Sequence, residues 1–192
     1  MKERIIRFLN AMNTSLEQIA NGERLDLYHI GRSALVWKHG FLSATQDVDV
    51  VAPIYRQRLM RAALDLFGVG TPKATEYGLY LEEVPPGLPP VWHGCFNRAS
   101  QANEQWSVIQ LFHFEDHDMA VTKMKRFNAR DQEDIRQMCD LELINPVTLR
   151  TRMDAAYPYR TDKDDDNEDW RKAYQHAKVV TDYLESGEWR PT

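Results

Sequence analysis

Two aspartates one residue apart are the side chains in this sequence best suited to chemistry. Asp47 and Asp49 stand in the segment DVDVV, whose valines favour a β-strand with one face against a core. Successive side chains of a strand alternate between its faces, so both carboxylates point the same way, with α-carbons about 6.6 Å apart. Carboxylates placed in this way can share one metal ion or bridge two. The alternative role is a solvated strand edge that discourages aggregation.

A glycine-containing turn precedes this strand. Gly31-Arg32-Ser33 follows an apolar run and begins a segment of helical character, which suits a tight strand-to-helix turn. The glycine lets a phosphate approach the backbone, and the exposed N–H groups at a helix start attract anions. A phosphate site beside a metal site indicates phosphoryl or nucleotidyl transfer.

A third carboxylate is expected from the segment EYGLYLEEV, residues 76–84, which we predict to be a neighbouring strand. The candidates are Glu82 and Glu83. We prefer Glu82, because Glu83 shares a face with the leucines that should line the core. The alternative is an exposed glutamate at the end of a strand.

The composition limits the functional classes. A formal net charge of −5 argues against a basic nucleic-acid surface, so that DNA binding is not expected and any RNA contact must be local. The two cysteines, Cys95 and Cys139, match no paired metal motif and suggest free thiols in a reducing compartment. Without an N-terminal signal or a long apolar run, the sequence predicts a cytoplasmic protein with no membrane segment.

The hydrophobic pattern predicts both strands and helices along the chain. Strands are predicted over 25–30, 76–84 and 106–114, and helices over 3–20, 54–67, 115–126, 129–141, 146–156 and 170–184. The side chains expected to face inward from three of these helices are Tyr55, Leu59, Ala63, Leu66, Ile135, Met138, Leu141, Val147, Leu149 and Met153.

Taken together, the motifs resemble the nucleotidyltransferase-like superfamily, in particular a minimal bacterial type related to AbiEii abortive-infection toxins and a sister group of uncharacterised proteins. That pattern is an apolar strand, Gly-Gly or Gly-Ser, a helix, and a Thr-x-Asp-hydrophobic-Asp strand, which here is YHIGRSALVWKHGFLSATQDVDVV. The stretch GLYLEEVPPGLPPVW is similar to the sister group's third-acid strand and proline turn. A later stretch, EDHDMAVTKMKRFNARDQEDIRQM, resembles the family's Asp-x4-Lys helix and charged Arg-x-x-Asp segment. The matching residues are Asp118, Lys123, Arg130, Asp131 and Asp134.

This resemblance implies an α/β fold of the α+β type, with residues 1–114 as a small mixed β-sheet flanked by helices and residues 115–192 as a helical C-terminal portion packed on this core. It also implies roles for individual residues. Three carboxylates would hold one or two Mg²⁺ or Mn²⁺ ions: Asp47, Asp49 and Glu82. Four residues would bind the nucleotide: Gly31, Arg32, Ser33 and Thr45. Lys123 would supply positive charge from the helical portion. The implied reaction moves a nucleoside monophosphate from a nucleoside triphosphate to an acceptor, either RNA such as tRNA or a protein. The toxin relationship further implies a toxin–antitoxin or phage-defence role and a cognate antitoxin.

Two departures from the family pattern leave other functions open. Arg32 replaces the second glycine, so that its side chain either grips the phosphates or blocks their path. The third carboxylate is a glutamate where aspartate is usual. The alternative function is a degenerate transferase fold that binds nucleotide, RNA or a partner protein without catalysis. A purely structural role as an antitoxin or assembly partner is a third reading.

Overall fold

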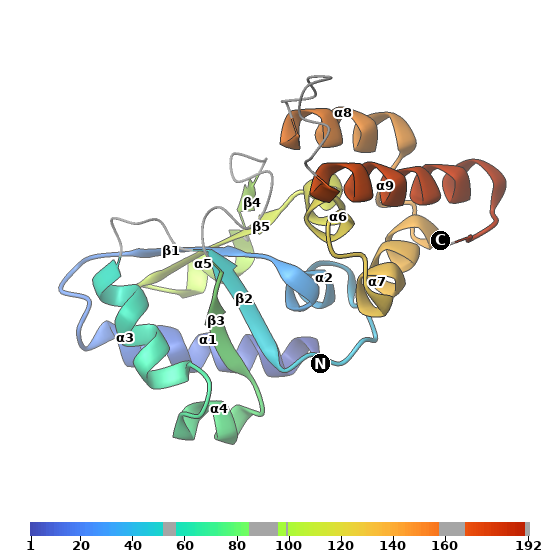
Figure 1. Ribbon diagram of the computed structural model, residues 1–192. Helices are drawn as coiled ribbons and strands as arrows, with labels where there is room; N and C mark the ends of the chain where they lie inside the picture. Colours follow the sequence, from blue (N-terminus) through green and yellow to red (C-terminus); the bar gives the residue numbers. More distant parts are fainter. Residues whose placement is uncertain (52–56, 85–95, 99, 158–167, 191–192) are drawn as a thin grey trace. The chain divides into compact units, whose positions relative to one another are not determined.

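The computed structural model describes residues 1–51, 57–84, 96–98, 100–157 and 168–190 (Figure 1). The chain divides into two compact units. The first contains Met1–Pro86 and Phe96–Phe114, and the second includes Glu115–Thr192.

The described residues of the first unit form a five-stranded mixed sheet in the order β3-β2-β1-β5-β4. The strands are β1 (Leu25–His29), β2 (Asp47–Val51), β3 (Tyr80–Glu83), β4 (Phe96–Arg98) and β5 (Ile109–Phe114). β1 is parallel to β5 and antiparallel to β2, whereas β2 is parallel to β3. The mixed sheet and the helical C-terminal portion confirm the predicted fold class.

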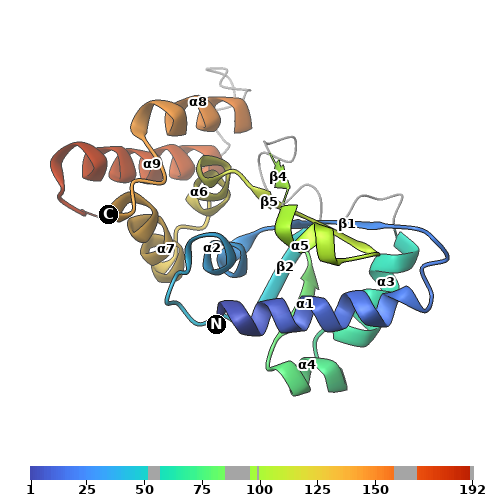
Figure 2. The same ribbon diagram turned by 180° about the vertical axis from the view of Figure 1, so that it is seen from behind.

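Helices pack on one face of this sheet. The helices of the first unit are α1 (Lys2–Glu17), α2 (Gly31–His39), α3 (Gln57–Phe67), α4 (Pro72–Tyr77) and α5 (Ser100–Gln105). α1 crosses the sheet in Figure 2 and buries Phe8, Leu9 and Met12 at helical spacing. The carbonyl oxygen of the buried Asn13 side chain accepts from the N–H groups of Val108 and Ile109, each at 3.0 Å. This amide therefore fixes the start of β5 against α1.

The two faces of the sheet differ in burial. In β1, Leu25, Leu27 and His29 are buried, whereas Asp26 and Tyr28 are half-buried. The alternation follows from the period of two along a strand. The half-buried face is the one that can meet a ligand, and the register of β1 with β2 places the Asp47 and Asp49 side chains on it.

The second unit is a bundle of α6 (Asp116–Met124), α7 (Ala129–Asp140), α8 (Pro146–Ala156) and α9 (Glu168–Ser186). α6 packs against the other three helices, and the apolar side chains between them are fully buried. Examples are Met119, Met124, Ile135, Leu149 and Val180. Asn128 and Asn145 cap α7 and α8 by accepting backbone N–H groups of the first turn.

A buried charge cluster joins α6 to α7. The ammonium of Lys123 lies 2.8 Å from Asp134 Oδ2 and 3.4 Å from Asp131 Oδ1. Arg126 donates to both carboxylate oxygens of Asp131, at 2.7 and 2.9 Å. Burial alone would raise the pKa of Asp131, but the Arg126 hydrogen bonds and the Lys123 and Arg126 charges outweigh it and lower the pKa.

Part of the predicted strand over residues 76–84 is wrong, because Pro72–Tyr77 form helix α4. The Thr71 hydroxyl accepts from the N–H of Ala74, Pro72 occupies the first turn, and Gly78 ends the helix at φ +61°. The strand predicted over 106–114 begins only at Ile109. These local start and stop signals outweigh the alternating pattern.

Most of the side chains expected to face inward are buried, but three are wrong, since Leu66, Leu141 and Val147 are 39%, 53% and 77% exposed. Tyr55 lies outside the described residues. Phe67 occupies the inner face of α3 next to Leu66. Leu141 lies beyond the end of α7, and Val147 lies in the outer part of the first turn of α8.

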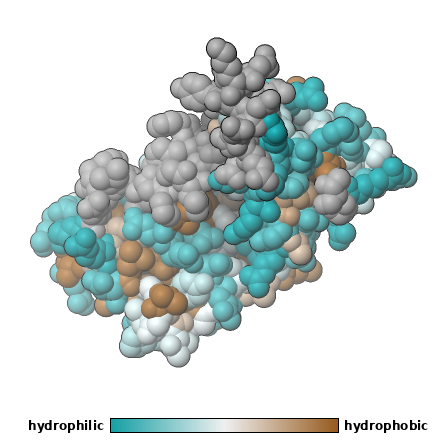
Figure 3. All heavy atoms as spheres, viewed as in Figure 1, coloured by the Kyte–Doolittle hydropathy of each residue, from teal (hydrophilic) through white to brown (hydrophobic). Residues whose placement is uncertain are grey.

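The surface carries no single dominant hydrophobic area where Figure 3 colours it. Hydrophilic residues predominate on that face, and hydrophobic ones occupy separate small areas. Among the described residues, no helix has both the length and the apolar content needed to cross a bilayer.

Acid should weaken the helical unit through Asp131. Because its pKa is lower in the folded chain, the stabilisation is present above the ordinary value of 3.8 and is lost as the pH falls through the folded value. We expect the free energy of unfolding, measured by urea titration between about pH 6 and pH 2, to fall less steeply for Asp131→Asn than for the parent. The surface variant Asp182→Asn is the control, and equal slopes for Asp131→Asn and the parent would contradict this assignment.

Candidate metal centre

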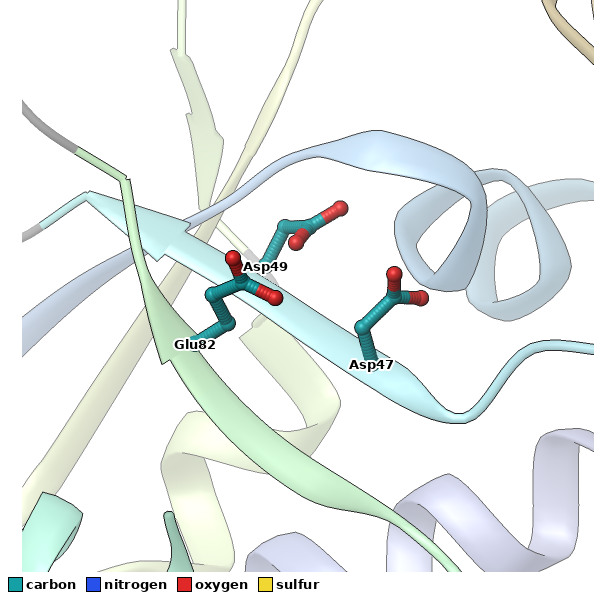
Figure 4. A group of neighbouring side chains, drawn as sticks. All are labelled: Asp47, Asp49 and Glu82. Atoms are coloured by element: carbon teal, nitrogen blue, oxygen red, sulfur yellow. The ribbon is translucent and has the colours of Figure 1, made fainter. Parts of the chain in front are cut away.

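Three carboxylates meet on the half-buried face of the sheet. Asp47 and Asp49 of β2 and Glu82 of β3 each offer an oxygen, and these oxygens lie within 4.8 Å of one another (Figure 4). Asp49 and Glu82 are direct partners in the parallel pairing, and Asp47 lies two residues before Asp49 on the same face. Glu83, the other candidate, pairs with Val50 of the buried face.

The spacing fits a small divalent cation. Mg²⁺ holds oxygen ligands at about 2.1 Å, so that two ligands of one ion are at most about 4.2 Å apart. Small side-chain rotations therefore bring these three oxygens to one ion. Close carboxylates repel one another, and a cation between them removes that repulsion.

Asp47 is oriented by Thr45. The Thr45 side chain is buried at 7% exposure, and its hydroxyl donates a hydrogen bond to the Asp47 carboxylate. The Thr45 carbonyl in turn accepts from Arg4 Nη2 at 3.2 Å. Thr45 thus contacts the acidic cluster through Asp47. The direct nucleotide contact expected from the sequence stays a prediction.

Asp49 is in close contact with the glycine turn. Gly31 has φ +70°, and a Cβ added there would lie 2.1 Å from Asp49 Oδ2. The N–H of Ile30 donates to the Asp49 carbonyl at 2.9 Å, which holds the turn against β2. Only glycine satisfies both the backbone angle and the space.

The turn leads directly into α2. Ile30, the N-cap residue, is apolar and offers no side-chain acceptor to the N–H groups of the first turn, and such a helix start favours anions. Arg32 is half-buried in this turn. Ser33 is fully buried and its hydroxyl pairs with His29 Nε2 at 2.8 Å, so a phosphate contact would use its backbone N–H.

His29 supports the turn from the buried face, a role that sequence reasoning missed. Burial and the neighbouring His113 hold the pKa of His29 well below its ordinary value, so the ring is neutral near pH 7. The two rings lie side by side on paired strands, with centroids 5.2 Å apart. The spacing His29-x3-Ser33 is the signal, because it spans the strand end and the first helical turn.

Tyr80 is a second residue that sequence reasoning did not assign to the site. It pairs with Asp47 in the β2–β3 register and shares the face of Glu82. Partial burial raises the pKa of Tyr80, and the charges of Asp47, Glu82 and Asp49 raise it further. The phenol therefore lies within the negative field of the three acids and stays protonated.

Lys123 belongs to the second unit. Its side chain is buried and bonded to Asp131 and Asp134, as described above. This gives Lys123 a structural role in joining α6 to α7. Its expected contribution to the reaction stays a prediction.

A comparison with protein families identifies the family to which this chain belongs. Residues 7–181 match a family model described as a nucleotidyltransferase of unknown function (DUF6036). The chain belongs to this family. No curated protein and no solved structure gives a significant match. The description agrees with the resemblance to nucleotidyltransferases, whereas a relationship to the AbiEii toxins stays a prediction.

Gly31→Ala should disrupt the metal centre of this nucleotidyltransferase family member. The added methyl group forces Asp49 away, whereas Gly40→Ala has a similar φ of +71° and meets nothing within 4 Å. Both variants carry the strain of a positive φ, about 1 kcal/mol. We therefore expect only Gly31→Ala to lose the Mg²⁺-dependent rise in melting temperature with nucleoside triphosphate. The same loss in Gly40→Ala would show that backbone strain, and not Asp49, is responsible.

Thr45→Val should weaken the metal site without altering its ligands. The substitution keeps the shape of the side chain and removes the hydrogen bond to Asp47. Loss of such an orienting partner typically lowers metal affinity about 10- to 100-fold. Isothermal titration calorimetry with Mn²⁺ measures this metal affinity, and Thr75→Val on α4 is the matched control. An unchanged Mn²⁺ affinity in Thr45→Val would remove Thr45 from the site.

Proposed function

We propose that this protein transfers a nucleoside monophosphate from a nucleoside triphosphate to an acceptor and releases pyrophosphate, with Mg²⁺ or Mn²⁺ required. The observation that carries the proposal is the close contact between the acidic cluster and the glycine turn, shown by Asp49 against Gly31. Membership of a nucleotidyltransferase family supports the reaction class. Acids alone would suit many cations, whereas acids beside an anion-binding helix start suit a metal–triphosphate complex.

Some of these residues bind charged groups of the substrate and cation, and others hold the binding residues in position. The N–H groups of the first turn of α2 bind the β- and γ-phosphates, with the Arg32 guanidinium as a second anchor. Asp47, Asp49 and Glu82 would hold the cation, which would neutralise charge on the triphosphate and make the α-phosphorus more electrophilic. Thr45 and Gly31 keep two of these carboxylates in place.

Lys123 is proposed to add positive charge from the helical portion. Its ammonium is already held by two carboxylates, so reaching a phosphate requires exchange of one of them. By resemblance, the acceptor is an RNA such as tRNA or a protein, and the biological role is that of a toxin with a cognate antitoxin.

A second candidate function is nucleotide binding without turnover, and Arg32 favours it. A guanidinium in the turn can bind the triphosphate where a second glycine would otherwise stand, but its bulk hinders entry of the triphosphate into the site. Arg32→Gly separates the two roles. Weaker triphosphate binding supports a grip on phosphate, and a gain of transfer supports a block.

Incubation with α-labelled nucleoside triphosphates tests the reaction. We expect label to move to RNA or protein in the presence of Mg²⁺ or Mn²⁺, and to be lost at least 100-fold in Asp47→Asn, Asp49→Asn and Glu82→Gln. All three variants should fold, because neutralising clustered acids relieves repulsion. Glu83→Gln, one residue along β3, is the matched control and should retain transfer. Tight triphosphate binding without any transfer would establish the binding module instead.

A further inference from the structure

Two aromatic rings stack on the half-buried face of the sheet. Tyr28 of β1 and Phe112 of β5 are direct partners in the parallel register, with ring centroids 5.1 Å apart and an interplanar angle of 24°. Both side chains are half-buried, so part of the stacked surface faces solvent. The same face carries Asp49, because the antiparallel register pairs Tyr28 with Val51, two residues further along β2.

The pair lies beyond the carboxylates as seen from α2. Asp49 pairs with Ile30 through the bond from the Ile30 N–H to the Asp49 carbonyl, and Tyr28 occupies the next position of that face on β1. One step of two residues along a strand is about 6.6 Å. The order along the face is therefore the start of α2, the carboxylates, and the aromatic pair.

This order assigns the two sides of the reaction, provided that the proposed function holds. The acceptor hydroxyl oxygen forms a bond to the α-phosphorus while the bond from phosphorus to the bridging oxygen breaks, and the hydroxyl proton passes to solvent. Attack and departure are in line, so the acceptor enters opposite the pyrophosphate. Since the start of α2 holds the leaving phosphates, the acceptor reaches the α-phosphorus from the opposite side, along the surface of Tyr28 and Phe112.

We infer that the Tyr28–Phe112 pair binds the unpaired terminal base of a single-stranded polynucleotide acceptor. A base is uncharged and stacks on aromatic rings, with about 1–3 kcal/mol per base. The phosphates of such a strand gain little favourable binding energy on this face, because Asp26, Asp49 and Glu82 give the face negative charge. Recognition by stacking fits this surface better than recognition by phosphate contacts.

The test is equilibrium binding of a fluorescein-labelled oligonucleotide, followed by anisotropy with Mg²⁺ present. The strand ends either in an unpaired adenine or in an abasic 3′ residue, in ribo and deoxyribo forms. We expect the parent protein to bind the base-bearing strand about tenfold more tightly than the abasic one. Tyr28→Leu and Phe112→Leu should abolish this difference, and Tyr28→Phe should keep it. The ribo and deoxyribo arms show which polymer supplies the base.

Tyr77→Leu is the matched control, because Tyr77 is a half-buried tyrosine of the same unit on α4. It should bind both strands as the parent does. Equal binding of base-bearing and abasic strands by the parent, or a retained difference in both leucine variants, would overturn the inference. Label transferred only to protein would overturn it as well.

Failure of the inference can be told apart from failure of the proposed function. Mg²⁺–triphosphate stabilisation in a melting assay should be the same in Tyr28→Leu and the parent, since the pair lies away from the phosphate turn. If the parent neither binds nor transfers nucleotide, the proposed reaction fails while the base dependence of strand binding is still measured directly. If transfer occurs but the affinity for the strand does not depend on the terminal base, only the inference fails.

Discussion

The contact between Gly31 and the Asp49 carboxylate is the constraint on which the site depends. It requires a backbone with positive φ and no side chain, and it requires β1 and β2 to run antiparallel as direct neighbours. Given that arrangement, the start of α2 and the acidic cluster share one small region. The positive end of a helix beside a carboxylate is favourable, and this offsets part of the repulsion within the cluster.

The buried face of the sheet makes this arrangement rigid. His29 and Ser33 bond beneath the turn, and the Asn13 amide ties α1 to the start of β5. Buried hydrogen bonds of this kind favour one arrangement of the chain, because breaking them would leave a buried donor or acceptor unpaired. Contacts on the buried face of the sheet consequently fix the position of the face that carries the acids.

Alternation along strands is local, and it explains what the sequence predicted well. The common face of Asp47 and Asp49 follows from a period of two, and so does the choice of Glu82 over its neighbour. The contact of Gly31 with Asp49 depends on strand register, which no local pattern contains. Helix α4 was missed for the opposite reason, because the caps at Thr71 and Gly78 are local signals that the alternating residues concealed.

The charged motif of the helical portion has a structural role in this protein. Lys123 near the end of α6 meets Asp131 and Asp134, three residues apart on one face of α7, so the spacing itself closes the turn between the helices. Removing Lys123 would take a cation away from two buried carboxylates, which is a structural reason for its presence. The three acids of the sheet differ, because gathering them on a half-buried face opposes stability. A costly cluster beside an anion-binding turn is therefore stronger support for chemistry than a stabilising one.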